Sequence, residues 1–362
     1  MYSLQELLQK MVKGKASDLH LSVGSPPQFR LDGKLQCQGT EALSPEDTRR
    51  LAYNIMTEKQ KKKFEQDSEL DLSFGIEGLA RFRCNIFMQR GNVSTAIRLI
   101  PFKIMGFREL GVPDAVAELA KLPRGLVLIT GTTGSGKSST LAALIDRINS
   151  EKHLHILTVE DPIEFLHSHG SCLINQREVH SDTISFASAL KYALRQDPDV
   201  VLIGEMRDLE TIEAALNISE TGHLVFGTLH TNSAAESINR IIDVFPSNRQ
   251  QQVRTQLSFC LQGVVCQQLL PRIGGGRALA LEVLICTPAI RAVIRDNKVH
   301  QIYSLIQAGA KYGMKTMNQS LAERCKAGRT TVQEAMSRSS DLGELNDMLS
   351  RQPQAKSLLK TF

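Results

Sequence analysis

The most constraining feature of this sequence is the segment GTTGSGKS at residues 131–138. An apolar stretch at residues 126–130 precedes it, and a helical pattern at residues 137–149 follows it. Glycines at this spacing let the backbone curl, so that successive N–H groups and a helix N-terminus face the same anion. The segment therefore predicts a strand, a phosphate-binding loop (P-loop) and a helix, in the order found in proteins that bind nucleoside triphosphates.

The polar residues of this loop have expected roles. Lys137 reaches oxygens of the β- and γ-phosphates, and the hydroxyl of Ser138 coordinates Mg²⁺. The predicted cofactors are therefore ATP and Mg²⁺. The predicted cofactor-binding residues are consecutive: Gly131, Thr132, Thr133, Gly134, Ser135, Gly136, Lys137, Ser138 and Ser139.

Apolar strands and helical patterns alternate through the middle of the chain. This alternation predicts an α/β fold with a doubly wound, mostly parallel sheet. The expected strands lie at residues 126–130, 155–159, 200–203, 224–228 and 278–286, and the expected helices at residues 137–149, 185–195 and 209–220.

The two ends of the chain have different patterns. A helical apolar face at residues 4–12, followed by short alternating stretches between residues 19 and 99, predicts a smaller α+β domain. Pro101 and the segment up to Pro113 predict a hinge. The expected organisation is a domain at residues 1–100, a linker at 101–113, a core at 114–287 and a C-terminal helical region at 288–362.

Glu205 follows the apolar strand at residues 200–203, and ligands of parallel sheets bind at the carboxyl ends of the strands. A carboxylate in this place can deprotonate the water that attacks the γ-phosphate, or hold Mg²⁺ through a water molecule. Glu205 is therefore the predicted general base. The alternative is a purely structural ion pair with Arg207 or another base.

Further acids and bases stand at the ends of other expected strands. Glu160 and Glu164 belong to an acidic stretch that suits magnesium and water, and the alternative is a turn built on Pro162 with solvated acids. His223 and His230 bracket the apolar residues 224–229. They are candidates to sense the γ-phosphate or to couple subunits, and the spacing alone favours histidines that are satisfied in the core.

Several arginines lie in the expected strands of the smaller domain. Phosphoryl transfer often uses an arginine from a second domain or a neighbouring subunit. The spacing alone favours ordinary surface arginines. The residues concerned are Arg81, Arg83, Arg90 and Arg98.

Composition and hydropathy exclude some classes of protein. A formal net charge of +5 and an aromatic content of 5% argue against a nucleic-acid partner. The longest apolar stretches are far shorter than the ~18–20 residues that span a bilayer. The first residues lack the pattern of a secretory signal, so we expect a cytoplasmic location.

Taken together, these segments resemble the secretion ATPase (GspE/PulE) superfamily, and within it the type IV pilus retraction ATPases (the PilT group). The resemblance covers nearly the whole chain. The matching segments are ASDLHL at 16–21 (PAS-like domain), GTTGSGKS at 131–138 (Walker A), TVEDPIEF at 158–165 (Asp box), PDVVLIGEMRD at 198–208 (Walker B), TGHLVFGTLHTNSA at 221–234 (His box) and AIRAVIR at 289–295 (the retraction group's AIRNLIR).

The resemblance implies a RecA-like P-loop core with an N-terminal PAS-like domain and a C-terminal helical appendage. It also implies that both histidines act at the nucleotide and that Arg83 and Arg98 are arginine fingers, with Arg81 and Arg108 as weaker candidates. The implied Mg²⁺ ligands are Ser138 and Glu205. The implied catalytic residues are Glu205, Lys137, Glu160, Glu164, His223, His230, Arg83 and Arg98.

The activity implied by the resemblance is ATP hydrolysis by a homohexamer that retracts type IV pili and drives twitching motility. The implied partners are further copies of the chain, an inner-membrane platform protein and a paralogous retraction ATPase, at the cytoplasmic face of the inner membrane. The alternatives are an accessory retraction ATPase, a pilus or type II secretion assembly ATPase, an ATP-binding regulatory adaptor and a nucleic-acid translocase. Assembly ATPases carry a tetracysteine metal site, whereas the seven cysteines here show no CxxC spacing.

Overall fold

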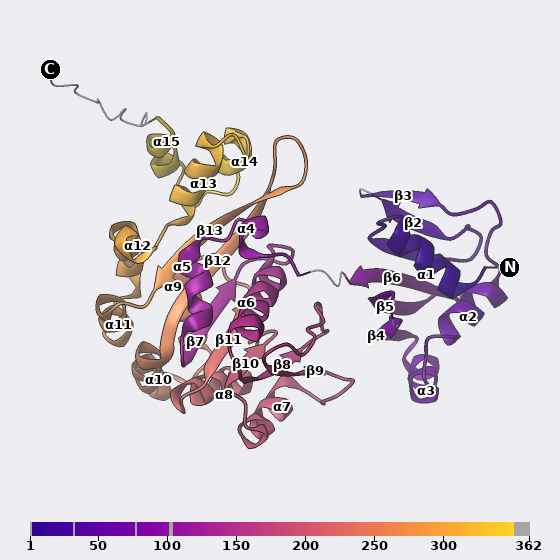
Figure 1. Cartoon of the computed structure of the whole chain (residues 1–362), viewed down its shortest axis with the longest axis horizontal. Coiled ribbons are helices and arrows are strands. Elements are labelled where there is room, and N and C mark those ends of the chain that lie inside the picture. The colour runs from indigo at the N-terminus through magenta and orange to yellow at the C-terminus, as the bar shows by residue number, and fades with distance from the viewer. Residues whose placement is uncertain (1, 32, 77, 101–103, 351–362) are drawn as a thin grey trace. The chain divides into compact units, whose positions relative to one another are not determined.

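The computed structural model describes residues 2–31, 33–76, 78–100 and 104–350 (Figure 1). It divides into two compact units, Met1–Lys103 with Glu164–Leu166, and Ile104–Ile163 with His167–Phe362. Of the expected linker, residues 101–103 lie outside the described residues, as do residues 351–362 of the expected helical region. Residues 104–113 group with the second unit, where Phe107–Leu110 form a short helix.

The first unit is built on an antiparallel sheet. In its described part, six strands follow the order β3-β2-β1-β6-β5-β4, and each neighbouring pair is antiparallel. Its elements are α1 (Leu4–Lys13), β1 (Asp18–Leu21), β2 (Gln28–Leu31), β3 (Lys34–Cys37), α2 (Pro45–Tyr53), α3 (Glu58–Asp67), β4 (Glu69–Ile76), β5 (Ala80–Gln89) and β6 (Asn92–Ile100).

Helical and strand periodicity together explain the core of this unit. The expected helix at residues 4–12 is present as α1, and its apolar face is buried. Along β5, Phe82 and Cys84 are buried at 0% exposure, whereas Arg83 between them is exposed. Alternation therefore places the apolar side chains of β5 in the core and leaves its arginines on the outer face.

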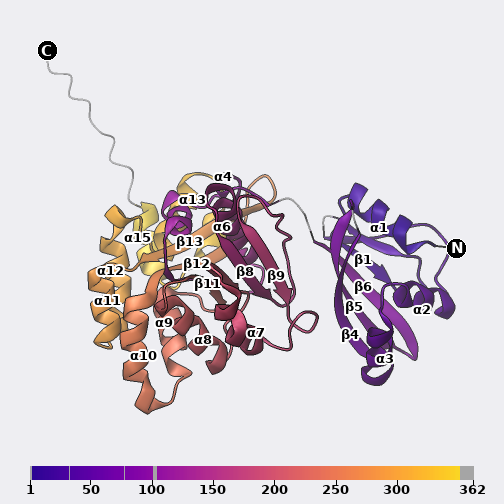
Figure 2. The same ribbon diagram turned by 60° about the horizontal axis from the view of Figure 1, so that its bottom comes forward.

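The second unit contains a larger, mostly parallel sheet. Its seven described strands follow the order β13-β12-β7-β11-β10-β8-β9, in which β13 alone is antiparallel to its neighbour. Strands β8 and β9 lie side by side in both views (Figures 1 and 2). The elements up to β11 are α4 (Phe107–Leu110), α5 (Asp114–Ala117), β7 (Gly125–Thr130), α6 (Lys137–Glu151), β8 (His155–Glu160), β9 (Leu173–Glu178), α7 (Phe186–Ala193), β10 (Val200–Ile203), α8 (Leu209–Glu220) and β11 (Leu224–Leu229).

The remaining elements complete the sheet and cover it with helices. They are α9 (Ala234–Asp243), α10 (Ser247–Cys260), β12 (Leu261–Pro271), β13 (Arg277–Ile285), α11 (Pro288–Arg295), α12 (Ile302–Ala308), α13 (Met317–Lys326), α14 (Val332–Met336) and α15 (Leu342–Ser350). Helices α13, α14 and α15 share a small apolar cluster with the ends of β12 and β13. Within the described residues, every helix is too short or too polar to pass through a lipid bilayer.

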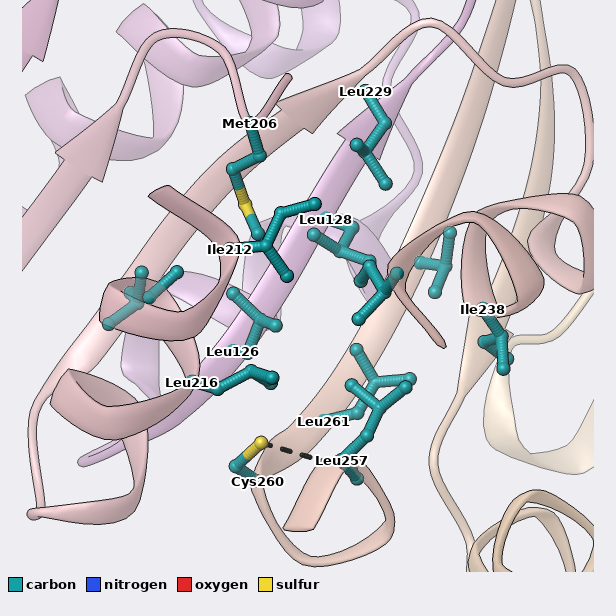
Figure 3. Close-up of a cluster of buried hydrophobic side chains, with 14 of the residues drawn as sticks. Leu126, Leu128, Met206, Ile212, Leu216, Leu229, Ile238, Leu257, Cys260 and Leu261 are labelled. Carbon is teal, nitrogen blue, oxygen red and sulfur yellow. Dashed lines mark hydrogen bonds between the residues drawn. The ribbon is translucent and has the colours of Figure 1, made fainter. Parts of the chain in front are cut away.

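Both faces of the large sheet are buried, which explains its continuous apolar strands. Leu126 and Leu128 of β7 join a cluster with helices α8, α9 and α10 (Figure 3). Val127 and Ile129 point the other way and join a second cluster with α6. Helices on both faces of a mostly parallel sheet confirm the predicted α/β fold class.

Strand β12 was not expected from the sequence, although it pairs with β7 next to the P-loop. Its apolar run is interrupted by Gln267, which is nevertheless only 1% exposed because its Nε2 donates to Thr140 Oγ1 at 2.8 Å. The pairing with β7 also shifts register between Leu261 and Gly263. Elements β3, α2, α3, β9, α9 and α10 were likewise not placed by the sequence analysis.

The central position of β11 gives a test of the core. Phe226 is 0% exposed and packs in the cluster that contains α6. Phe226→Ala should therefore lower the free energy of unfolding by about 3–5 kcal/mol, measured by urea unfolding followed by circular dichroism. Leu173→Ala on edge strand β9, where the side chain is 52% exposed, is the matched control. Equal losses in the two variants would contradict the central place of β11.

Candidate active site

Four parallel strands bring candidate residues of the second unit to one edge of the sheet. Strand β7 leads into the P-loop, β8 ends at Glu160, β10 ends two residues before Glu205, and β11 ends directly before His230. The neighbouring pairs β7–β11, β11–β10 and β10–β8 are all parallel. Since parallel strands end at the same edge, the sheet itself gathers these side chains.

The backbone of the P-loop at Gly131 accepts glycine alone. Its φ is +138°, and a Cβ atom there would lie 2.4 Å from the main-chain oxygen of Gln267 and 2.6 Å from Oγ of Ser135. Gly136, with φ +92°, stands directly before α6. The loop therefore curls tightly against β12 before the helix begins.

The polar groups of the P-loop fit a phosphate group. Helix α6 has no side-chain N-cap, which leaves the N–H groups of its first turn for an anion. Ser135 is 3% exposed, and its Oγ has no hydrogen-bond partner within the described part of the chain. Thr132, Thr133 and Gly134 are exposed. An anion bound over the loop would meet the N–H groups of the first turn of α6 and the hydroxyl group of Ser135.

Lys137, Ser138 and Ser139 form the first turn of α6. Lys137 Nζ donates to the main-chain oxygens of Gly131 at 2.8 Å and Thr132 at 3.2 Å, so its ammonium group lies over the loop. Ser138 and Ser139 are half-buried beside it. This is the arrangement that a lysine and a hydroxyl need in order to contact phosphates and their cation.

One carboxylate oxygen of Glu205 contacts two basic side chains. Its Oε1 lies 2.5 Å from Nε of Arg207 and 3.2 Å from Nε2 of His230. The ion pair with Arg207, which the sequence left as the alternative, is therefore present, although the Arg207 side chain is 73% exposed.

The surroundings of Glu205 keep it ionised. Burial alone would raise the pKa of its carboxyl group. The hydrogen bond from Arg207 and the electrostatic interactions with His230, Arg207 and Lys137 outweigh burial and hold the pKa of Glu205 below its ordinary value. An ionised carboxylate within range of Lys137 can accept a proton or hold a hydrated cation.

The two candidate histidines lie at opposite edges of the sheet. His230 follows β11 and contacts Glu205, as stated above. His223 precedes β11, where its main-chain oxygen accepts from Gly125 N at the start of β7, and its Nδ1 lies 3.1 Å from the main-chain oxygen of Ile218. Six residues of strand, about 20 Å, separate it from the P-loop edge. The structure therefore brings His230 to this site and leaves His223 out of it.

The two glutamates of the acidic stretch at the end of β8 belong to different units. Glu160 stays at the sheet edge, where its Oε1 accepts from Thr158 Oγ1 at 2.6 Å and from Gln176 Nε2 at 3.2 Å. Glu164 is exposed and groups with the first unit. The large sheet therefore positions Glu160 and Glu205 but not Glu164.

Of the candidate arginines, Arg108 lies in α4 of the second unit, and the others belong to the first unit. Arg83 and Arg98 are cross-strand neighbours on β5 and β6, and both are exposed. Nε of Arg98 pairs with Oδ1 of Asp18 at 2.8 Å, and Arg81 donates to Ser73 Oγ at 2.6 Å. Arg83 and Arg98 thus form a basic pair on the outer face of the small sheet.

Sequence reasoning missed Gln267, whose main chain bounds Gly131 and whose side chain holds Thr140 of α6. The apolar residues 264–266 and 269–270 on either side of Gln267 and Gln268 were the available signal of a strand. Among the described residues, no group of three or more His, Cys, Asp and Glu side chains forms a metal cage. Mg²⁺ is usually bound by one or two carboxylates, phosphate oxygens and water rather than by such a cage, so Ser138 and Glu205 stay candidate ligands.

The family model described as "Type II/IV secretion system protein" matches residues 2–274. The type IV pilus retraction ATPase PilT of Pseudomonas aeruginosa is 52% identical over 318 residues, which cover 88% of this chain and 92% of that protein. The type IV pilus ATPase PilU of the same organism is 39% identical over 346 residues, covering 95% and 91%.

A solved structure agrees with these relatives. The crystal structure of the pilus retraction motor PilT with bound ADP matches with a TM-score of 0.91 at 51% identity, and the match covers 96% of this chain and 100% of the other. The resemblance read from the sequence motifs is confirmed, and so is the RecA-like fold of the core.

The close approach at Gly131 gives a test of the P-loop. Gly131→Ala should weaken ATP binding at least about a hundredfold, or about 2.7 kcal/mol, because the added methyl group must displace the loop from β12. Titration with a fluorescent nucleotide measures the effect. Gly274→Ala is the matched control, since Gly274 has φ +86° but nothing within 4 Å of the added atom. Unchanged affinity of Gly131→Ala for ATP would contradict the close approach of Gly131 to β12.

Proposed function

The chain belongs to the type II/IV secretion system protein family, and on that basis we propose that it is an ATPase that powers retraction of type IV pili. The observation that carries this proposal is the meeting of the P-loop, Glu205 and His230 at one edge of the large sheet. Its higher identity to PilT than to PilU favours the retraction ATPase over the accessory paralogue.

In this proposal the P-loop holds the polyphosphate of ATP. The N–H groups of the loop and of the start of α6, together with Lys137, contact the phosphate oxygens. Mg²⁺, bound with the nucleotide, supplies positive charge that neutralises those oxygens. Ser138 and, through a water molecule, Glu205 are the residues that would hold it.

Glu205 is the proposed general base. Its carboxylate accepts a proton from the water that attacks the γ-phosphorus, while the bond to the bridging oxygen breaks and ADP leaves. His230 orients this carboxylate through the 3.2 Å contact with Oε1. Glu160, held by Thr158 and Gln176, is proposed to order water beside it.

Hydrolysis is proposed to take place in a homohexamer. Arg83 and Arg98 lie exposed as neighbours on one sheet face, which suits arginine fingers offered to the phosphates of a neighbouring copy. We assign residues 1–100 to a PAS-like domain and residues 114–287 to the ATPase core. Movement of one domain against the other would then convert hydrolysis into force.

The partner that receives this force is proposed to be an inner-membrane platform protein. The chain would act in the cytoplasm and reach the membrane through that partner. Retraction would withdraw pilin from the pilus and so drive twitching motility.

The division of work between Lys137 and Glu205 is testable with two variants. Glu205→Gln should bind ATP with wild-type affinity but lose at least about a hundredfold in turnover, because the amide cannot take the proton. Lys137→Ala should lose nucleotide binding as well. Nucleotide titration and a steady-state phosphate-release assay measure both. Normal turnover in Glu205→Gln would remove the assignment of the base.

The direction of work is testable in piliated cells whose only copy carries Glu205→Gln. A retraction motor predicts excess surface pili and no twitching, because assembled pili are not withdrawn. Electron microscopy and a stab-agar motility assay give the two readouts, with the wild-type copy as control. Bald cells would identify an assembly motor instead.

A further inference from the structure

Glu282 is a buried carboxylate that the proposed reaction does not use. It lies in β13, opposite Cys266 of β12, and is 3% exposed. Burial raises the pKa of Glu282, while hydrogen bonds from the main chain of Ala234 and Met317 act in the opposite direction. A carboxylate is costly to bury unless such donors compensate it, so these two contacts are the key to its role.

Both donors are the first residues of helices. Ala234 begins α9, and its N–H donates to Oε1 of Glu282 at 2.7 Å. Met317 begins α13. The side-chain caps of these helices, Ser233 and Thr316, accept from N–H groups further along. Glu282 therefore accepts the Ala234 N–H group that the Ser233 cap leaves over, and its carboxyl group also faces the first N–H group of α13.

Glu282 also lies between two hydrophobic clusters on one face of β13. Ala280, Glu282 and Leu284 alternate with residues that face α6, so they share one face of the strand. Ala280 packs in the cluster of α13, α14 and α15, whereas Leu284 packs in the cluster of α8, α9 and α10. Glu282 is the polar residue between them.

The start of α9 fixes the segment that carries His230. Thr231 is 4% exposed, and its Oγ1 lies 2.6 Å from Oγ of Ser237 in α9. Asn232 N donates to Oε2 of Glu236, also in α9, at 2.8 Å. Residues 231–233 are therefore tied to α9, and His230 lies between this segment and the end of β11.

We propose that Glu282 is a positioning residue that ties the start of α9, and through it His230, to the C-terminal helices that begin with α13. The tie between the helices is independent of the proposed function, whereas its effect on turnover rests on the proposed role of His230. A movement of α13 would then reach the candidate active site through one carboxylate.

Hydrogen–deuterium exchange of the full chain tests the tie itself. Glu282→Gln keeps the size of the side chain but offers an amide where a second acceptor is needed, and Glu282→Met offers no acceptor. Both should speed exchange at residues 231–237 and at 317–320. Ser320→Ala is the matched control, because it removes the acceptor of Leu281 N on α13 and leaves Glu282 intact. It should affect 317–320 alone. Unchanged exchange at 231–237 in both Glu282 variants would overturn the proposal.

A double-mutant cycle tests the path through His230. Glu282→Gln should lower kcat roughly ten- to a hundredfold and leave KM for ATP within about twofold, because orientation and not binding is lost. In a His230→Asn background the same change should cost less than about twofold. Equal losses in both backgrounds would show a purely structural role. If the wild type has no turnover, the proposed function fails, and the exchange experiment still decides the tie.

Discussion

Burial of one parallel sheet on both of its faces is the constraint on which the rest of the second unit depends. A strand covered on both sides must be apolar throughout, and it must alternate with helices that supply the covering layers. Parallel order then forces every strand to end at the same edge. Polar residues at these ends meet without any further device, which is how residues 74 positions apart in the chain, Gly131 and Glu205, come to serve one site.

Much of this arrangement could be predicted from the sequence, because the signals were local. The apolar runs of β7 and β10 and the glycine pattern of the P-loop need no tertiary information. Strand β12 could not be predicted in the same way, since the buried amide of Gln267 donates to Thr140, a residue 127 positions away. Its polarity in the sequence marks a long-range partner and not a surface position.

The places of His223 and Glu164 have different physical reasons. His223 stands at the amino end of β11, and strand direction alone assigns it to the far edge. The family resemblance, by contrast, implied a place for His223 at the nucleotide. Glu164 lies only four residues after Glu160, but it belongs to the other compact unit, so the sheet that positions Glu160 does not position Glu164. Nearness in sequence predicts nearness in space only while the chain stays in one element.

The register shift between Leu261 and Gly263 has a consequence for the whole of β12. Gln262 is held at this point by Arg291 Nη2 at 3.0 Å and by Cys286 N at 2.9 Å, while its neighbours pair with β7. Because side chains alternate, the strand beyond it has Gln267 toward α6 and Cys266 toward the opposite core. Deletion of one residue here would exchange the two faces of the strand. Gln267 would then lie in the apolar cluster on the opposite face, and Cys266 would lie against α6. The register shift at Gln262 thus decides which face of the sheet each later side chain of β12 occupies.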